Sequence, residues 1–228
     1  MLAILPVSAV VRPATARTSV ASGGLVGGEL SPKAAAAARA RAAVRRQLAE
    51  RGQGTYIGDM LAERDSALAR WPDQHGRPLT VWIQPSADIA GWDSEYVTGV
   101  RDAFLTWDAL RLPVRFAFTS DSADADVHVT FIDHFDEPIS GRTKWTRDDD
   151  WWIIDANISL ALHHRSGAAL DGEAMKALAL HEVGHLLGLD HTDDPTSIMA
   201  PRVRVRSLSA ADRATARLLY TLPPGGVR

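Results

Sequence analysis

The sequence predicts an α/β (α+β) protein built on a twisted, mostly parallel sheet that is backed by helices. The first observation is the order of segments between residues 78 and 187, which runs strand, helix, four strands, helix. The second is composition. A chain of 228 residues with 46% hydrophobic and 23% charged residues is typical of a soluble globular protein with one good-sized core.

The first residues, MLAILPVSAVVRPATAR, combine an apolar run at 2–11 with the small-x-small triplet Ala14-Thr15-Ala16. This pattern resembles an export signal without its basic start, and it suggests a secreted or extracytoplasmic protein. A disordered apolar tail, or a chain whose true start lies elsewhere, would give the same pattern. The run is too short to span a bilayer.

Two helices are expected next, at 32–51 and 58–70. The first begins with Ser31 and Pro32, which suit the N-cap and the first helical position. It is rich in alanine and arginine and has little large apolar surface, so we expect it to lie outside a core. Residues 1–75 are therefore interpreted as an N-terminal appendage without a catalytic group, and 76–228 as the catalytic domain.

Within 76–228 the strands are recognised by β-forming residues and alternation. They are expected at 78–85, 114–120, 125–133, 141–147 and 151–162. The segment 141–147 (GRTKWTR) is polar and charged, as a strand at a sheet edge tolerates. Helices are expected at 93–110, which has apolar residues at helical spacing, and from about 171 to 187.

The second of these helices contains HEVGH, residues 181–185. His181 and His185 are one turn apart on the same face, so both imidazoles can reach one ion. Glu182 stands beside the first ligand and can take a proton from the attacking water. Catalytic zinc has three protein ligands, and a chain with no cysteine must build them from His, Asp and Glu.

Gly188 can take a positive φ, end the helix and turn the chain back so that His191 becomes the third ligand. The alternative is a set of packed or surface histidines without metal. That alternative does not explain why the glutamate and the glycine also stand where zinc chemistry needs them.

HEVGHLLGLDH resembles the metzincin motif H-E-x-x-H-x-x-G-x-x-H, and SIMAP (197–201) resembles the Met-turn, with Met199 beneath the zinc. The short spacing between the two is similar to the matrixin branch. The resemblance covers about residues 78–222 and includes the helix 208–220, with Ser209 as N-cap and Asp212 at N3. It implies a five-stranded, mostly parallel sheet with an antiparallel edge strand, two long helices and a C-terminal helix.

The family resemblance also implies a zinc endopeptidase whose substrate pairs antiparallel with the strand 141–147. The substrate-binding residues that it implies are Gly141, Arg142, Thr143, Lys144, Trp145, Pro201 and Val203. Val203 stands where many matrixins have a tyrosine that walls the S1′ pocket. Without cysteine, latency through a propeptide thiol is excluded.

The expected function is hydrolysis of extended polypeptides with one catalytic zinc, by a monomer. A zinc-containing peptide-binding or adhesion module without turnover is the main alternative, and hydrolysis of a non-peptide amide is a third. A net charge of −3 gives no reason to expect nucleic acid as a partner. The aspartates within 121–126 and 148–150 could bind calcium, and histidines 128, 134, 163 and 164 a second zinc, although no ligand pattern supports either.

Overall fold

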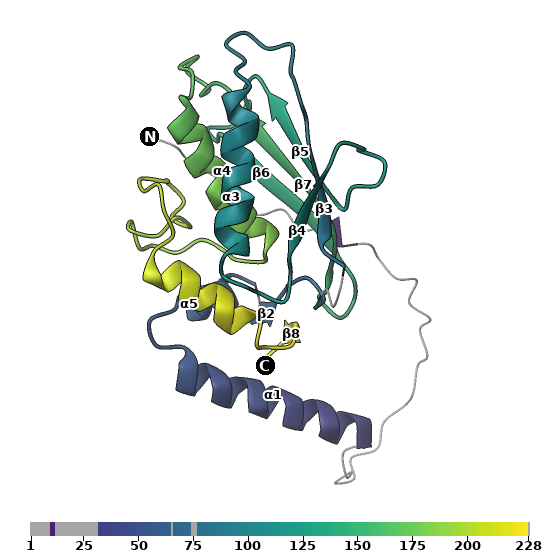
Figure 1. Ribbon diagram of the computed structural model, residues 1–228. Coiled ribbons are helices and arrows are strands. Elements are labelled where there is room, and N and C mark those ends of the chain that lie inside the picture. The colour runs from purple at the N-terminus through teal and green to yellow at the C-terminus, as the bar shows by residue number, and fades with distance from the viewer. Residues whose placement is uncertain (1–9, 12–31, 65, 74–76, 228) are drawn as a thin grey trace, which may run out of the picture.

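The structure is a computed structural model that describes residues 10–11, 32–64, 66–73 and 77–227. Figure 1 shows how its elements are arranged. The helices are α1 (Pro32–Arg51), α2 (Ile57–Glu63), α3 (Glu95–Asp108), α4 (Gly172–Leu186) and α5 (Ala210–Leu219). The strands are β1 (Val10–Val11), β2 (Ala67–Leu68), β3 (Leu79–Ile83), β4 (Phe116–Thr119), β5 (Val127–Ile132), β6 (Gly141–Arg147), β7 (Ile153–Ala161) and β8 (Gly225–Gly226).

The main sheet has the order β1-β6-β7-β5-β3-β4. Strands β7, β5, β3 and β4 run parallel to one another, and β6 runs antiparallel to β7. This confirms the predicted five-stranded, mostly parallel sheet with one antiparallel strand. The two-residue β1 adds a sixth strand, which sequence analysis missed, and it pairs only with Thr146 and Arg147 of β6.

Helices α3 and α4 lie side by side on one face of the sheet (Figure 1). α3 buries its apolar stripe, which consists of Tyr96, Val100, Ala103, Phe104 and Trp107. The indole of Trp107 also donates a hydrogen bond of 2.8 Å to the Leu180 carbonyl. α4 is buried on nearly all sides from Leu178 to Leu186, which fixes the helix rigidly between α3 and the sheet.

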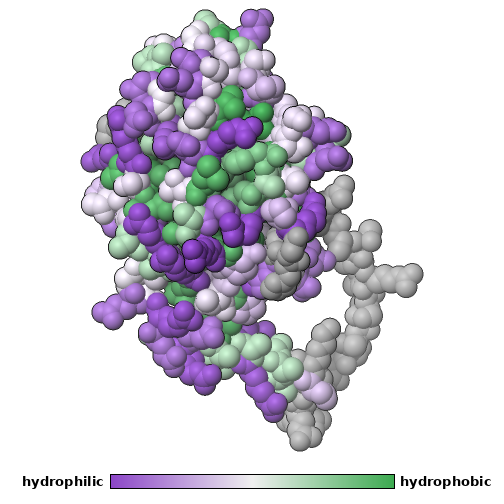
Figure 2. Space-filling view, in the orientation of Figure 1, coloured by the Kyte–Doolittle hydropathy of each residue, from purple (hydrophilic) through white to green (hydrophobic). Residues whose placement is uncertain are grey.

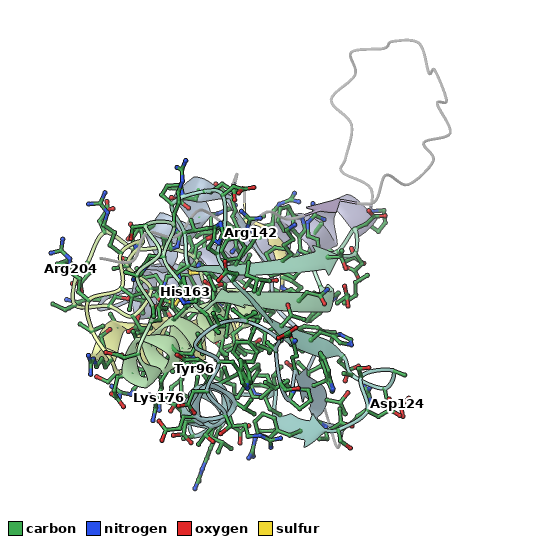
Figure 3. The ribbon with its side chains drawn as sticks, turned by 90° about the horizontal axis from the view of Figure 1, so that it is seen from above. Tyr96, Asp124, Arg142, His163, Lys176 and Arg204 are labelled. Atoms are coloured by element: carbon green, nitrogen blue, oxygen red, sulfur yellow. The ribbon has the colours of Figure 1, made fainter. Side chains whose placement is uncertain are left out.

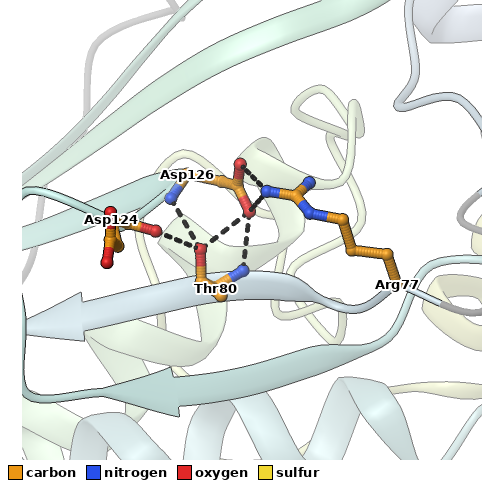
Figure 4. Close-up of polar contacts among 4 residues, drawn as sticks. All are labelled: Arg77, Thr80, Asp124 and Asp126. Atoms are coloured by element: carbon orange, nitrogen blue, oxygen red, sulfur yellow. Dashed lines mark hydrogen bonds and ion pairs between the residues drawn. The ribbon is translucent and has the colours of Figure 1, made fainter.

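Asp126, before β5, ties that strand to β3 (Figure 4). It accepts hydrogen bonds of 2.8 Å from both the amide and the hydroxyl of Thr80, and it pairs with Arg77 at 2.8 Å. Protein donors therefore already satisfy this carboxylate, and it does not support the calcium interpretation of residues 121–126.

α1 has the predicted bounds, but the predicted helix 58–70 is wrong beyond Glu63. Ser66 takes a φ of 63°, which ends helical geometry, and Ala67 and Leu68 pair antiparallel with Gly226 and Gly225. The sequence SALAR fits either a helix or an extended strand. In the structure this segment is extended, because both Ala67 and Leu68 are buried and pair with β8 in that conformation.

Side chains that precede residue 75 belong to the same core as the sheet. The buried ones include Val44, Tyr56, Ile57, Met60, Leu68 and Trp71. The expectation that the first helix stays outside a core is therefore wrong at Val44, although the surface where α1 lies is mostly hydrophilic with small apolar residues (Figure 2). The domain boundary at residue 75 stays a prediction, but residues on both sides of it pack into one hydrophobic core.

Candidate metal centre and active site

His181 and His185 project from the same face of α4, and their ring centroids are 4.6 Å apart. Nδ1 of His181 lies 2.6 Å from the Ile198 carbonyl, and Nδ1 of His185 lies 2.9 Å from the Leu189 carbonyl. Because a carbonyl only accepts, both Nδ1 atoms carry the proton. Each Nε2 is therefore left with a free lone pair, as a metal ligand requires.

A turn at Gly188 brings the third imidazole to the other two. Gly188 has a φ of 95°, and the Leu189 amide donates back to the Gly184 carbonyl at 3.0 Å. An added Cβ at Gly188 would lie 2.2 Å from the Ala69 carbonyl oxygen, so only glycine fits. His191 Nε2 then lies 3.1 Å from His185 Nε2.

Glu182 is fully buried against β6. Its Oε2 accepts a hydrogen bond of 2.6 Å from the Thr143 hydroxyl, whereas its Oε1 has no hydrogen-bond partner. Burial raises the pKa of Glu182 to about 8, and the Thr143 hydrogen bond and the charge of Arg142 offset part of that rise. A Cβ at Gly141 would stand 2.3 Å from Oε1, so β6 must present a glycine at this point.

The loop that contains Met199 is held from beneath by Asp212, which is fully buried. The Asp212 carboxylate accepts hydrogen bonds from the Ser197 hydroxyl and, at 3.1 Å, from the Ile198 amide. It also completes the predicted capping box with Ser209 at the start of α5. The sulfur of Met199 lies against Gly184 of α4, and the Ile198 carbonyl orients His181.

Three observations test whether a zinc ion fits these residues. The ligand atoms of His181, His185 and His191 all lie within 4.8 Å of one another. The buried Nε2 of His181 has no partner. Burial and the neighbouring His191 lower the pKa of His181 to about 3, so it is neutral without giving up a proton. Three neutral nitrogens and no thiolate match a catalytic zinc site.

The predicted substrate-binding residues fall into two groups. Gly141, Thr143 and Trp145 turn inward from β6, whereas Arg142 and Lys144 turn outward. Thr143 is thus brought to Glu182, a contact that the strand pattern alone could not predict. Along 141–145, none of the strands that the structure describes pairs with the outer edge of β6.

Pro201 and Val203 lie in the segment between Met199 and α5. Val203 is half-buried and lines a cavity of about 170 Å³ with Ala174, Ala177, Arg204, Val205 and Arg206. Arg202 and Arg204 are exposed, and Figure 3 shows Arg204 at the outer boundary of the molecule.

The other four histidines that the structure describes, at 128, 134, 163 and 164, have other partners. Asp133 contacts Nδ1 of both His134 and His163 at 2.7 Å. His164 bonds to Ser140 at 3.0 Å, and His128 lies 2.8 Å from the Ser122 carbonyl. Among the described residues, the three histidines on and after α4 are the one group of three or more close metal ligands. Nothing here supports a second ion.

The fold and this site together define a protein with a buried three-histidine metal centre on the helix that backs a mostly parallel sheet. Residues 70–221 match the family model described as matrixin, and the chain belongs to this family. Among the described residues, none of the helices is both long and apolar enough to cross a membrane.

The chain is similar to several curated relatives. It is 36% identical to matrix metalloproteinase-16 of Homo sapiens over 113 residues, which is 47% of this chain and 16% of that protein. It is 31% identical to Metalloendoproteinase 1-MMP of Arabidopsis thaliana over 147 residues, 57% of this chain and 38% of that one. It is 25% identical to Metalloendoproteinase 1 of Glycine max over 153 residues, 58% and 48% of the two chains. The chain thus spans less than half the length of these relatives.

Proposed function

We propose that this protein is a zinc-dependent endopeptidase that hydrolyses peptide bonds of extended polypeptides. The observation that carries the proposal is the pairing of three neutral, converging imidazoles with a buried carboxylate that has one unpaired oxygen. His181, His185 and His191 would hold one zinc ion. When bound, the ion lowers the pKa of water and polarises the scissile carbonyl.

Glu182 is proposed as the catalytic base. Its burial beside the ligand His181 and its unpaired Oε1 suit a group that takes a proton from water and later passes it to the leaving amine. Thr143 holds Oε2, so Oε1 is the atom that receives and returns the proton. Met199 is proposed to support the ligands from below, as in a Met-turn.

The substrate backbone is proposed to pair with the outer edge of β6 along Gly141–Trp145. An extended peptide can add there as a further strand, because backbone amide and carbonyl groups along that edge point outward and can form hydrogen bonds with the peptide. Pro201 and Val203 would wall the pocket for the side chain that follows the scissile bond.

A zinc-containing peptide-binding module without turnover is the competing function. It needs the imidazoles and the β6 edge but not a carboxylate with a raised pKa. Glu182, which is enclosed and held in one orientation, therefore favours hydrolysis. We further propose that the protein acts as a monomer outside the cytoplasm, the latter from the export-like pattern at 2–16, which lies almost wholly outside the described residues.

A peptide-library digest with purified protein, with and without chelator, tests the activity. We expect cleavage that chelator stops and added zinc restores. Glu182→Gln should keep the zinc but lower turnover by about a hundredfold or more, whereas His185→Ala should release the metal. Wild-type turnover in Glu182→Gln would leave the assigned mechanism without its base.

A further inference from the structure

The carbonyl groups of residues 186–189, where α4 ends and the chain turns, accept hydrogen bonds from side chains. Such carbonyls lack intrahelical partners and must be satisfied in another way. The pairs are Trp71 Nε1 to Leu186 O at 2.9 Å, Tyr220 OH to Leu187 O at 3.2 Å, Arg64 Nη1 to Gly188 O at 3.0 Å and His185 Nδ1 to Leu189 O at 2.9 Å.

Arg64 is unusual among these donors because it contacts the turn at two points. Besides donating to the Gly188 carbonyl, its guanidinium forms an ion pair with Asp190, the residue directly before His191. The side chains of Arg64 and Asp190 are only 12% and 4% exposed. The guanidinium also lies 5.2 Å from the centre of the Trp145 ring, on β6. Arg64 therefore connects the turn, the sheet and the end of α2.

Arg64 comes from a part of the chain that the family match does not include, since that match begins at residue 70. Its neighbours approach the same turn. The Ala69 carbonyl lies against Gly188, and Asp59 of α2 is 3.5 Å from the hydroxyl of Thr192. Asp59, Arg64 and Ala69 thus contact three residues of the turn and of the chain after it, Gly188, Asp190 and Thr192.

We propose that Arg64 is a positioning residue for the metal centre: it holds the turn 188–190 so that the His191 imidazole stays within reach of the ion. This inference rests on the proposed zinc site. The buried carboxylate of Asp190 needs a cation, and without one it would draw water into the turn or move toward solvent. Either change displaces His191, which is the next residue along the chain.

The test is zinc affinity, measured by competition with a chromophoric chelator, in the full chain. Arg64→Leu keeps an apolar contact with Trp145 but loses the charge and the donors, and we expect zinc binding about 10- to 100-fold weaker. Arg64→Lys should recover part of this loss, since one ammonium can pair with Asp190 but cannot also match the planar fork. Hydrogen exchange should rise in 186–192 and stay unchanged in β7.

Two controls separate positioning from stability. Arg46→Leu removes an exposed arginine of α1, with a side chain 73% exposed, and should leave affinity unchanged. Leu79→Ala opens a cavity in β3, away from the turn, and should lower the melting temperature without weakening zinc binding. Equal weakening in Leu79→Ala, or wild-type affinity in Arg64→Leu, would overturn the inference.

If Arg64→Leu does not fold, Asp190→Asn gives the answer instead, because it removes the same ion pair with almost no change in volume. It should also weaken zinc binding, and wild-type affinity in that variant would equally overturn the inference. A wild-type protein that binds no zinc would refute the proposed function itself. Zinc binding and cleavage in the wild type with no effect of Arg64 or Asp190 would refute only the role of Arg64.

Discussion

The hydroxyl of Thr143 donates a hydrogen bond of 2.6 Å to Oε2 of Glu182 and lies 3.0 Å from the Glu182 carbonyl. The Thr143 side chain thus contacts both the carboxylate and the backbone carbonyl of the proposed base. The contact links the β6 edge, where substrate is proposed to bind, to the carboxylate that is proposed to move the proton.

Thr143→Val removes this hydroxyl and keeps the shape of the side chain. The hydrogen bond favours the charged carboxylate and lowers its pKa, so its loss should raise that pKa further. We expect kcat to fall about tenfold, with the acidic limb of its pH profile moved to higher pH. Zinc content should stay at the wild-type value. An unmoved acidic limb would show that Glu182 does not depend on Thr143.

Glu182 should also make the free energy of unfolding of the metal-free protein depend on pH. Its pKa is about 8 in the folded state against 4.5 for an ordinary glutamate, so the folded state binds the proton more tightly. The stabilisation is complete below pH 4.5 and is lost as pH rises toward 8. The lowered pKa of His181, about 3, acts oppositely: its contribution is complete above pH 6.5 and is lost as pH falls toward 3.

Glu182→Gln should abolish the decline between pH 4.5 and 8. At pH 8 we expect the chelator-treated variant to be more stable than the wild type by a few kcal/mol, since each pKa unit corresponds to about 1.4 kcal/mol. At pH 4.5 the two should be equal. Urea unfolding at both pH values measures the difference. Parallel curves for variant and wild type would contradict the pKa assigned to Glu182.

The zinc ligands could be predicted from sequence because the chemistry fixes their spacing on one helix and one turn. His181, Glu182 and His185 need only helical periodicity, and Gly188 marks the turn. The sheet could be predicted because its strands are long and apolar or clearly alternating. Asp212 carried a local signal, the capping box with Ser209, which predicted a helix start but not its bonds to Ser197 and Ile198.

Contacts between distant segments could not be predicted in this way. Arg64 and Asp190 are ordinary charged residues, and nothing local says that they pair across 126 positions or are buried. β2 and β8 are too short to show alternation, since each has two residues. α1 looked too polar for a core, yet Val44 is enclosed there.

Gly188→Ala tests the turn that brings His191 to the site. The residue has a φ of 95°, and an added Cβ would lie 2.2 Å from the Ala69 carbonyl oxygen. We expect a loss of about 2 kcal/mol or more in unfolding free energy, together with weaker zinc binding. Gly167→Ala is the matched control, because Gly167 has a φ of 83° but no atom within 4 Å of an added Cβ. It should cost only the backbone strain and keep zinc affinity; an equal loss in both variants would mean that the contact with Ala69 is irrelevant.

A chain shortened to begin at Trp71 tests the role of the N-terminal segment. If residues 1–75 were an appendage, as the sequence alone predicts, such a chain would fold and keep its zinc site. The structure changes that expectation, since the deletion removes Tyr56, Met60 and Arg64 from the core and the turn. A chain beginning at residue 53 should retain zinc affinity, whereas the one beginning at Trp71 should aggregate or bind zinc weakly. Equal zinc affinity in both would return the boundary to residue 75.

The segment after Met199 predicts that a preference for acidic substrate residues depends on the salt concentration. Val203 is half-buried and lines this cavity, whereas Arg202 and Arg204 beside it are exposed; Arg204 and Arg206 also line the cavity. We propose that this cavity takes the P1′ side chain and expect an apolar preference there, because Ala174, Ala177, Val203 and Val205 line it. Acidic residues further along the substrate should be favoured by at most about fivefold, since exposed charges attract weakly in water. Cleavage-site profiling at low and high salt checks both statements, and the acidic preference should disappear at high salt.

The double variant Arg202→Gln, Arg204→Gln should remove the acidic preference at low salt as well. Arg213→Gln, on the exposed face of α5, should not remove it. A charged preference at P1′ itself would show that a residue other than Val203 forms this wall.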